Sequence, residues 1–531
     1  MVNALQKSHA DGVPADLDEA ADLIAAYVRR ILAARVYDVA IESPLDRLEK
    51  LSGRLDADIF LKREDLQQVF SFKLRGAYNK MANLDADSLG RGVICASAGN
   101  HAQGVALAAS RLGGRAVIVM PLTTPGIKVQ AVAALGGEVV LHGDGYDEAA
   151  AHARKIAAAE SLTFIPPFDD PDVIAGQGTI GMEILRQHTA PIAAIFVPIG
   201  GGGLAAGIAA YVKFLRPETR IIGVEPDDAA SMQAAIQADA QVTLDQVGLF
   251  ADGVAVRRVG AETFKLCRLL LDEIITVDTD AVCAAIKDIF DETRSIAEPS
   301  GALGLAGLKK YREREGTVPG ALIAINSGAN LNFDRLRHIA ERAEIGEHRE
   351  ALLAVGIPEQ PGSYRRLIQS LGRRAVTEFN YRFAGGSQAQ IFLGVALNKG
   401  LAEGREIAQA LRAEGYSVVD LSDNEMAKVH ARYMVGGRVE GIAHERIYRF
   451  QFPERPGALM KFLEGMSASW NITLFHYRNQ GADYGRVLAG IQIPPGEEAS
   501  FATYLERLAY PYSDETDNPA YALFLGASPA S

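Results

Sequence analysis

A lysine inside an apolar segment is the first residue in this chain whose type and position could do chemistry. Lys73 lies between Phe72 and Leu74, where the pattern predicts the first turn of a helix. An amine that is partly removed from water has a lowered pKa, and the neutral amine can form a Schiff base. A surface lysine whose stem covers apolar neighbours has the same sequence pattern. Taken alone, the segment favours the surface lysine.

A short polar loop follows the apolar run 92–96 and consists of Ser97, Ala98, Gly99, Asn100 and His101. Backbone N–H groups between a strand and a helix can bind a carboxylate or a phosphate. Ser97 and Asn100 would add hydrogen bonds from their side chains. A loop that only caps the helix explains the pattern equally well. His101 by itself is better explained as a packed, hydrogen-bonded side chain.

Four consecutive glycines, Gly200, Gly201, Gly202 and Gly203, follow a second apolar run and precede a helical pattern that begins with Leu204. Glycine lets the main chain pass closely around a phosphate with its N–H groups pointing inward. The spacing matches neither the nucleotide-binding P-loop nor the dinucleotide fingerprint. The segment therefore predicts a phosphate cradle without indicating a nucleotide. The alternative is a tight turn required by packing of the helix on the sheet.

Ser327 follows a third apolar run, at the edge where open parallel sheets bind ligands. Its hydroxyl could hydrogen-bond a ring nitrogen, although a turn or a helix cap is the simpler interpretation of this segment alone. Glu298, which precedes Pro299 at a predicted helix start, fits capping or packing as well as a ligand contact. Together, the lysine, the phosphate cradle, the anion-binding loop and the neutral hydroxyl match pyridoxal 5′-phosphate (PLP) and an amino acid.

Between residues 58 and 326 the sequence predicts alternating strands and helices, which would position these groups. Short apolar runs separated by segments of helical period are typical of βαβ units, whose parallel strands are buried on both faces. An amphipathic helix is also predicted over residues 18–34. The runs predicted as strands are 92–96, 116–120, 138–141, 194–198, 221–225 and 322–326, and two of the predicted helices are 102–112 and 128–135.

Composition excludes several classes of protein. The 531 residues predict about three or four domains. Lys and Arg number 54 against 66 Asp and Glu, and without a basic stripe this balance argues against nucleic-acid binding. Three cysteines, Cys95, Cys267 and Cys283, form neither a disulfide framework nor a metal-ligand spacing, which favours a reducing compartment. The N-terminus shows no signal peptide.

One uncharged stretch, residues 189–212, is long enough to cross a bilayer. It contains the four-glycine segment, which would be a poor choice for a helix that faces lipid. A buried strand, a tight turn and a buried helix explain the stretch better, and no membrane association is expected.

Beyond a charged connector near residues 337–350, the glycine-punctuated pattern stops and an internal repeat appears. The segment PEQPG at 358–362 returns as PERPG at 453–457, and FNYR at 379–382 returns as FHYR at 475–478. Two linked motifs that recur at nearly the same offset predict a duplicated α+β module.

The motifs SFKLRGA, SAGNHAQG, GGGGL and NSGAN occur in the order found in fold-type II PLP enzymes, which this chain resembles. The C-terminal repeat narrows the resemblance to biosynthetic threonine dehydratases, also called threonine ammonia-lyases. The similarity covers about residues 20–528 and includes VTEFNYRF and FHYRNQGADYGRVLAG in the tail. The resemblance implies an α/β fold of the tryptophan synthase β type with two open twisted sheets, followed by an α+β ACT-like regulatory repeat.

The resemblance also implies a role for each motif. Lys73 would hold PLP covalently and act in catalysis, Phe72 would lie beside the cofactor ring, and Asn100 would bond its 3′-oxygen. Ser327 would face the pyridine nitrogen and would also act in catalysis. The cofactor phosphate would be bound by Gly200, Gly201, Gly202, Gly203 and Leu204. The substrate carboxylate would be bound by Ser97, Ala98, Gly99, Asn100 and His101.

The implied activity is deamination of L-threonine to 2-oxobutanoate and ammonia, with L-serine as a poorer substrate. The family implies a cytoplasmic homotetramer that isoleucine inhibits and valine relieves. Candidate effector residues are Pro456, Gly457, Leu459 and Leu463, although the two leucines could simply be the core face of a helix. Some fold relatives bind a cation after a V-E-P strand end. Residues 227–231 offer no clear ligand set, so no metal site is expected here.

The expected domain organisation follows the motifs. A flexible tail (1–17) precedes a PLP-dependent catalytic domain (18–338), which contains a small subdomain at about 60–165. A connector (339–350) then leads to ACT-like domains at 351–425 and 446–528.

Four other functions are compatible with parts of the sequence. A serine-preferring dehydratase or a racemase could use the same catalytic fold, but short relatives of those kinds lack the duplicated tail. A non-catalytic amino-acid sensor would not need Lys73, the glycine segment and Ser327 together. A nicotinamide oxidoreductase is disfavoured by the glycine spacing.

Overall fold

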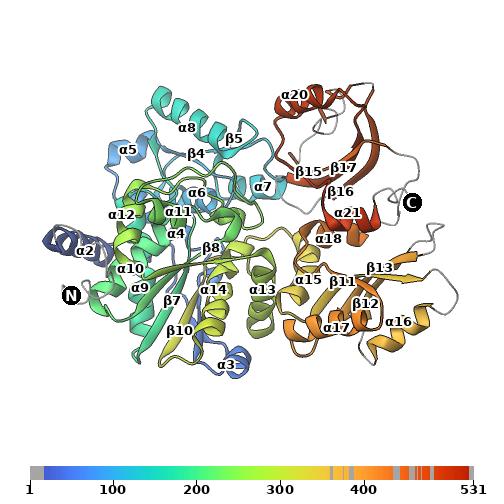
Figure 1. Cartoon of the computed structure of the whole chain (residues 1–531). Helices are drawn as coiled ribbons and strands as arrows, with labels where there is room; N and C mark the ends of the chain where they lie inside the picture. Colours follow the sequence, from blue (N-terminus) through green and yellow to red (C-terminus); the bar gives the residue numbers. More distant parts are fainter. Residues whose placement is uncertain are drawn as a thin grey trace. The chain divides into compact units, whose positions relative to one another are not determined.

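Parallel strands linked by helices make up the first of the two units into which the chain divides. In the computed structural model (Figure 1) these units are Met1–Phe333 and Asp334–Ser531. The structure describes residues 17–525, apart from 359–362, 373, 375, 382–387, 434–442, 454–457, 459–460, 463–464, 468 and 479–483.

The larger sheet of the first unit has six strands in the order β1-β2-β10-β7-β8-β9, and only β1 runs antiparallel to its neighbour. Its strands are β1 (Leu45–Arg47), β2 (Ile59–Arg63), β7 (Ile192–Pro198), β8 (Arg220–Pro226), β9 (Glu273–Val277) and β10 (Ala321–Asn326). The three strands predicted here from apolar runs are confirmed, each with its bounds extended by one or two residues. The central strands are buried because helices cover both faces.

The smaller sheet has four parallel strands in the order β5-β4-β3-β6. They are β3 (Val93–Ala96), β4 (Ala116–Met120), β5 (Glu138–Leu141) and β6 (Thr163–Phe164). The structure confirms the predicted bounds of β4 and β5. Both sheets therefore have the open, parallel character that the alternating pattern predicts.

Helices connect the strands of both sheets. Those described in the first unit are α2 (Leu17–Leu32), α3 (Glu49–Leu55), α4 (Lys73–Ala82), α5 (Ala86–Arg91), α6 (Asn100–Leu112), α7 (Gly126–Ala134), α8 (Tyr146–Glu160), α9 (Pro171–Gln187), α10 (Gly203–Leu215), α11 (Ser231–Ala238), α12 (Ala261–Leu270), α13 (Thr279–Thr293) and α14 (Pro299–Glu315), with 3₁₀ turns η1 (Glu64–Leu66), η2 (Asp227–Ala229) and η3 (Asp252–Val254). In Figure 1, α9, α10 and α12 lie on one side of the larger sheet, and α13 and α14 lie on the other.

The helix that carries Lys73 packs closely against α9. A Cβ added at Gly76 would lie 2.7 Å from the carbonyl oxygen of Val173, and one at Gly176 would lie 2.7 Å from Cα of Gly76. Only glycine permits the two backbones to approach this closely. On its other side α4 packs with α6 in the core of the smaller sheet, where Leu74 and Ala77 are fully buried. Packing on both sides fixes α4 between the two sheets.

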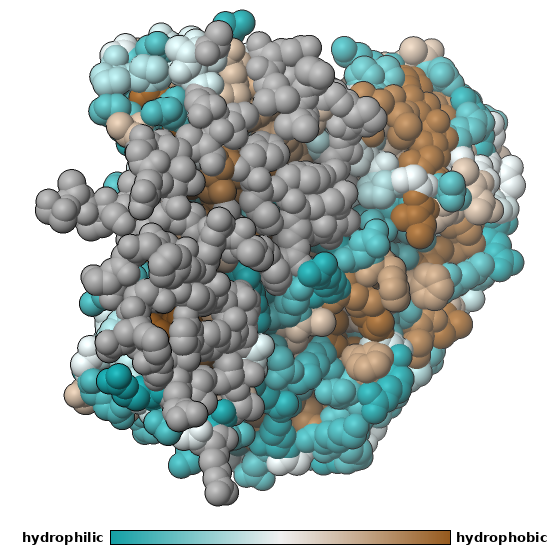
Figure 2. All heavy atoms as spheres, turned by 90° about the vertical axis from the view of Figure 1, so that its right-hand side faces the viewer, coloured by the Kyte–Doolittle hydropathy of each residue, from teal (hydrophilic) through white to brown (hydrophobic). Residues whose placement is uncertain are grey.

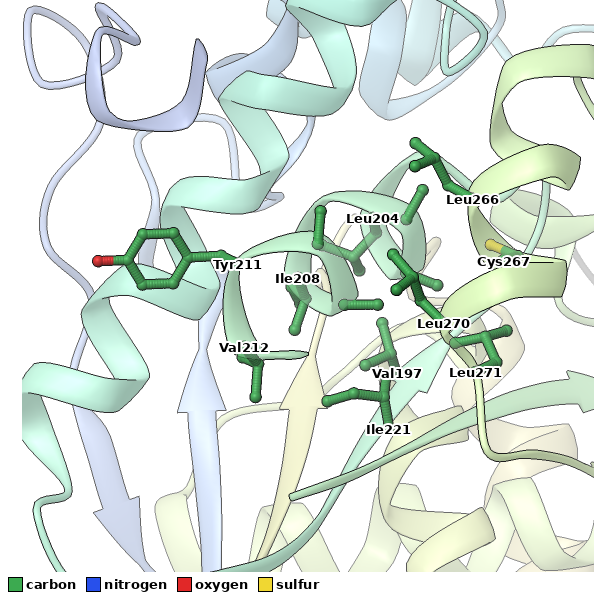
Figure 3. Close-up of a cluster of buried hydrophobic side chains, with 14 of the residues drawn as sticks. Val197, Leu204, Ile208, Tyr211, Val212, Ile221, Leu266, Cys267, Leu270 and Leu271 are labelled. Carbon is green, nitrogen blue, oxygen red and sulfur yellow. The ribbon is translucent and has the colours of Figure 1, made fainter. Parts of the chain in front are cut away.

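The predicted strand and helix in the uncharged stretch are both confirmed, as β7 and α10. Figure 3 shows Leu204, Ile208 and Val212 of α10 pointing toward side chains of β7, β8 and α12. The stretch is thus a buried strand, turn and helix. Among the described residues, no helix is long and apolar enough to cross a membrane. On the face shown in Figure 2, hydrophobic residues of the described surface lie in patches between hydrophilic ones.

The second unit contains two antiparallel four-stranded sheets with matching strand orders, β12-β13-β11-β14 and β16-β17-β15-β18. The matching order confirms the duplicated α+β module that the repeated motifs predict. Its elements are α15 (Arg335–Gly346), β11 (Glu350–Pro358), α16 (Ser363–Leu371), β12 (Val376–Tyr381), β13 (Gln388–Ala396), α17 (Leu401–Ala413), β14 (Ser417–Asp420), α18 (Glu425–Val429), η4 (Ala431–Tyr433), β15 (Glu445–Pro453), β16 (Asn471–Arg478), β17 (Tyr484–Gln492), α20 (Glu498–Leu508), β18 (Tyr512–Asp514) and α21 (Pro519–Phe524).

The two copies share a hydrophobic core. Leu352 and Phe392 of the first sheet belong to the same buried cluster as Ile447 and Leu488 of the second. A mixed cluster of this kind makes the two copies one packed unit.

Candidate active site

The loop in front of Lys73 is bound to the loop that follows β10. Ser71 and Gly328 form an isolated antiparallel bridge. The backbone N–H of Phe72 donates to the carbonyl oxygen of Ser327 at 3.2 Å. The first residue of α4 is Lys73, as the sequence predicts. These contacts hold the lysine at the carboxyl edge of the larger sheet, where parallel sheets bind ligands.

The amine of Lys73 is surrounded by protein, although the residue as a whole is only partly buried. Its Nζ donates to the carbonyl oxygen of Pro167 at 3.1 Å and lies 5.3 Å from the centre of the Phe72 ring. Burial lowers the pKa of this amine to about 8, against the opposing effect of the negative charge of Glu298. About half of the amine is therefore neutral and nucleophilic near pH 8. The environment is that of a desolvated amine and not of a surface lysine.

The first glycines after β7 lie too close to neighbouring residues to carry a side chain. A Cβ added at Gly201 would lie 2.2 Å from the ring of Phe168, and one at Gly200 would lie 2.9 Å from Cα of Val254. Close packing alone therefore requires glycine here, as the tight-turn interpretation proposes. The same packing places the loop next to Phe168, the residue after the carbonyl partner of Lys73.

The last glycines begin α10. Gly202 has a φ of +97°, a conformation that favours glycine, and it offers no side chain to cap the helix. The first-turn N–H groups of α10 can therefore bind an anion, so the tight turn and the phosphate cradle are compatible interpretations. The carbonyl of Gly201 accepts a hydrogen bond from the Thr263 hydroxyl at 2.6 Å. Leu204 packs its side chain into the core, so it could contact a phosphate only through its backbone.

The polar loop after β3 leads into α6, which begins at Asn100. The helix has no side-chain cap, because its N-cap residue is Gly99. The Ser97 hydroxyl accepts a hydrogen bond from the Gly99 N–H at 3.3 Å. The loop thus combines an uncapped helix start with a hydroxyl close by, which suits a carboxylate.

His101 is 3% exposed and its Nε2 lies 2.9 Å from the carbonyl oxygen of Ile165. Burial, assisted by the positive charge of Lys73, lowers the pKa of His101 to about 3. The ring is neutral at physiological pH and is engaged with the protein. Its described contacts match the packed, hydrogen-bonded histidine that the residue alone suggests.

Ser327 is 3% exposed and donates a hydrogen bond to the carbonyl oxygen of Ser300 at 3.3 Å. It follows the last residue of β10, at the same sheet edge as the glycine loop after β7. A hydroxyl is neutral, so it can meet a ring nitrogen without imposing a charge.

Two short segments that the sequence analysis did not single out connect these loops. Residues 167–168 touch both Lys73 and Gly201. Residues 253–254 touch Gly200 and lie beside the start of α14, where a Cβ added at Gly253 would be 2.8 Å from Oγ of Ser300. The structure therefore brings Lys73, the glycine loop and the NSGAN loop together.

Glu298 and Asn330 are further members of the site. Glu298 accepts a hydrogen bond from Nδ2 of Asn100 at 2.6 Å, and Asn330 donates to Oδ1 of Asn100 at 2.6 Å. The sequence around Glu298 fits a cap, a packing residue or a ligand contact, and the structure shows that its side chain makes no cap hydrogen bond. The only features of the sequence that pointed to Glu298 and Asn330 were a helix start at Pro299 and a second asparagine in NSGAN.

The candidate effector residues Pro456, Gly457, Leu459 and Leu463 lie outside the described residues. In the part of the chain that the structure describes, no group of three or more His, Cys, Asp or Glu side chains could hold a metal ion.

The V-E-P segment ends β8 and leads into η2. Glu225 in this segment accepts hydrogen bonds from the N–H groups of Met232 and Gln233 at 2.8 and 2.9 Å. Burial raises the pKa of its carboxyl to about 7. The side chain therefore acts as an acceptor for the start of α11.

Family models match most of the chain. Residues 36–328 match the pyridoxal-phosphate-dependent enzyme family. Residues 341–431 and 436–525 match the C-terminal regulatory domain of threonine dehydratase. The second match occurs twice, in agreement with the repeated sheets.

Relatives of known name match over nearly the full length. The chain is 59% identical to the biosynthetic L-threonine dehydratase IlvA of Burkholderia multivorans, covering 94% of this chain and 99% of that protein. It is 56% identical to the IlvA enzyme of Escherichia coli, covering 94% and 97%. The processed form of threonine deaminase isoform 2 from Solanum lycopersicum is 54% identical, with a TM-score of 0.60 over 61% of this chain and 94% of that one. This chain therefore belongs to the biosynthetic threonine dehydratase family of PLP-dependent enzymes.

Proposed function

We propose that this enzyme converts L-threonine to 2-oxobutanoate and ammonia, the first committed step of isoleucine biosynthesis. The observation that carries the proposal is the buried amine of Lys73, with a pKa of about 8, next to the glycine loop. The names of the full-length relatives support L-threonine as the substrate. One threonine yields one 2-oxobutanoate and one ammonia, because the water lost from the β-carbon is regained when ammonia is released.

The described groups fit PLP. Lys73 supplies a buried amine for covalent attachment, and the uncapped start of α10 after Gly202 suits a phosphate. Phe72 adjoins the amine, Asn100 offers an amide to a ring oxygen, and Ser327 offers a neutral hydroxyl to a ring nitrogen. When bound, PLP supplies an electron sink for charge that develops on the substrate α-carbon.

Lys73 is the general base in this proposal. Near neutral pH an amine whose pKa is about 8 can both accept the α-proton of the substrate and return it. Ser327 would present a neutral hydroxyl to the ring nitrogen, whereas a carboxylate in its place would favour a protonated ring. A neutral hydroxyl favours rapid loss of the β-hydroxyl over side reactions.

The loop that begins with Ser97 is proposed to hold the substrate carboxylate. Its donors would be the backbone N–H groups of 98, 100 and 101 and the Ser97 hydroxyl, while the N–H of Gly99 donates to the Ser97 oxygen. The ring of His101 already contacts the carbonyl of Ile165, so this residue would act through its backbone. L-Serine lacks one methyl group, which is worth only about 1–3 kcal/mol of discrimination, so serine should be a poorer but measurable substrate.

The duplicated C-terminal module is proposed to bind branched-chain amino acids, with isoleucine as inhibitor and valine as the effector that relieves inhibition. Its match to the regulatory domain of threonine dehydratase supports this role. Inhibition requires that isoleucine bind two states of the enzyme with different affinity. We further propose that the enzyme works as a cytoplasmic homotetramer, which sedimentation of the purified protein would test.

The decisive experiment measures 2-oxoacid production by the purified holoenzyme from L-threonine and L-serine, with and without isoleucine and valine. We expect threonine to be preferred, isoleucine to inhibit and valine to restore the rate. Lys73→Ala is the control and should be inactive. Absence of 2-oxobutanoate, or formation of D-serine as the main product from L-serine, would overturn the proposal.

A further inference from the structure

Three polar side chains form a chain of hydrogen bonds beside Lys73. Nδ2 of Asn100 donates to Oε1 of Glu298 at 2.6 Å, and Oδ1 of Asn100 accepts from Nδ2 of Asn330 at 2.6 Å. The three residues come from the start of α6, the residue before α14 and the loop after β10. The amide of Asn100 is therefore held from both ends by residues that are far away in the sequence.

This arrangement permits only one orientation of the Asn100 amide. An asparagine amide has nearly the same shape when its nitrogen and oxygen are exchanged, so its orientation depends on its partners. An ionised carboxylate can only accept, so Glu298 requires the nitrogen of Asn100 on its side. Asn330 presents an N–H on the other side and also donates to the carbonyl oxygen of Val69 at 2.8 Å.

Glu298 is itself held firmly. The residue is 4% exposed, and its backbone N–H donates to the carbonyl oxygen of Gly328 at 3.1 Å. A Cβ added at Gly328 would lie 2.6 Å from Oε1 of Glu298, so the glycine of NSGAN leaves space for this carboxylate. The carboxylate thus has a fixed place against which the Asn100 amide is aligned.

We propose that Glu298 and Asn330 are positioning residues, which fix the Asn100 amide so that its second N–H is free to donate to the ring oxygen of PLP. The amide nitrogen carries two hydrogens, and Glu298 accepts only one of them. If the amide were reversed, its oxygen would face the ring oxygen and repel it. This inference rests on the proposed cofactor site but not on the substrate.

Two variants, one that removes the carboxylate at position 298 and one that moves it to position 330, distinguish a positioning role from a merely structural one. In Glu298→Gln the side chain can donate, so Asn100 is free to turn. In the double variant Glu298→Gln/Asn330→Asp the carboxylate stands on the opposite side, and the amide should be held firmly in the reversed orientation. Asp288→Asn is a matched control, because it removes a buried carboxylate that pairs with Arg54 at 2.7 Å, outside the site.

The readouts are PLP affinity by titration of the cofactor-free protein, the absorption spectrum of bound PLP across pH, and unfolding by denaturant. We expect Glu298→Gln and the double variant each to weaken PLP binding by about tenfold, which is the loss of affinity expected for one lost hydrogen bond to a charged or polar oxygen. Both variants should also change the absorption spectrum of bound PLP. Asp288→Asn should lower stability without changing either cofactor signal.

Two results would overturn the inference. One is a wild-type PLP affinity and spectrum in Glu298→Gln. The other is recovery of both by the double variant, which would mean that any carboxylate in the hydrogen-bonded chain suffices. Measurements of PLP affinity and of the absorption spectrum do not require threonine. Failure of the inference is therefore distinguishable from failure of the proposed reaction.

Discussion

Arg75 donates a hydrogen bond to Glu183 at 2.6 Å, and neither side chain is exposed to solvent. Arg75 lies two residues after Lys73 on α4, whereas Glu183 is on α9. The same guanidinium also donates to both carboxylate oxygens of Glu64 at 2.8 Å. Lys62 donates to the other oxygen of Glu183 at 2.6 Å. A buried network of two cations and two anions thus ties α4, the helix that begins with Lys73, to α9 and the end of β2.

We expect Arg75→Met to lower the free energy of unfolding by about 3–5 kcal/mol, because the buried Glu64 would lose both hydrogen bonds from Arg75 while Glu183 would keep Lys62 as its cationic partner. Denaturant unfolding of the cofactor-free protein measures the change. Arg186→Ala is the control, since the Arg186–Glu42 pair is largely exposed and should contribute at most about 1 kcal/mol. Equal effects of the two substitutions would contradict the role of the buried network.

Lys73 should react with amine reagents at a much lower pH than an ordinary lysine. In the cofactor-free folded protein, the pH dependence of its acylation should have a midpoint near 8, against about 10.5 after unfolding in urea. Peptide mass spectrometry identifies the modified lysine. A midpoint near 10 in the folded protein would show that the amine is not desolvated.

The same pKa shift makes a prediction for stability. Between pH 8 and pH 10.5 the unfolded chain binds the Lys73 proton more tightly than the folded one does. The contribution of Lys73 to stability should therefore become more favourable as pH rises through this window. Denaturant unfolding at several pH values should show a stability advantage of Lys73→Met that is largest below pH 8 and shrinks toward pH 10.5. An advantage independent of pH would contradict the assignment.

Two ion pairs connect the flank of the smaller sheet with residues 252–257. Lys128 of α7 pairs with Asp252 at 2.8 Å, and Asp147 of α8 pairs with Arg257 at 3.3 Å. Because Val254 packs beside Gly200, loosening this segment should disturb substrate binding. We expect Lys128→Ala to raise KM for threonine several-fold with a smaller change in kcat, and the exchange Lys128→Asp/Asp252→Lys to recover part of the loss. Steady-state kinetics that stay unchanged in Lys128→Ala would refute this coupling.

Glu425 links three elements of the regulatory unit. It accepts hydrogen bonds from Arg342 of α15 at 2.9 and 2.8 Å and from Arg486 of β17 at 2.7 Å. Burial opposes its ionisation, but the two guanidinium groups outweigh burial and hold the pKa of this carboxyl well below its ordinary value. Glu425 therefore joins the helix that opens the regulatory unit to the second copy of the module.

We expect Glu425→Gln to destabilise the regulatory unit by about 1–3 kcal/mol, less than a fully buried pair would, because the side chain is 34% exposed. It should also shift the isoleucine concentration for half-inhibition several-fold while leaving the rate without isoleucine nearly unchanged. Arg337→Ala, on the exposed side of α15, is the control. Identical inhibition curves for Glu425→Gln and wild type would exclude a regulatory role for this link.

Local patterns were sufficient to predict much of the catalytic region. Apolar runs predict β4 and β5 with their observed bounds, and the glycines after β7 predict the turn into α10. The position of Lys73 at a helix start follows from the same kind of local pattern. Such features are readable because strand period, helix period and glycine conformation depend on near neighbours in the chain.

The environment of the lysine was decided only by the tertiary structure. From its own segment Lys73 looked like a surface residue, because nothing nearby in sequence reports that Pro167 and Glu298 surround its amine. The contact between Asn100 and Glu298 spans 198 positions, and that between Arg75 and Glu183 spans 108. Desolvation and hydrogen bonding depend on which distant segments meet in space, so the residue types were evident from the sequence while their pKa values and orientations were not.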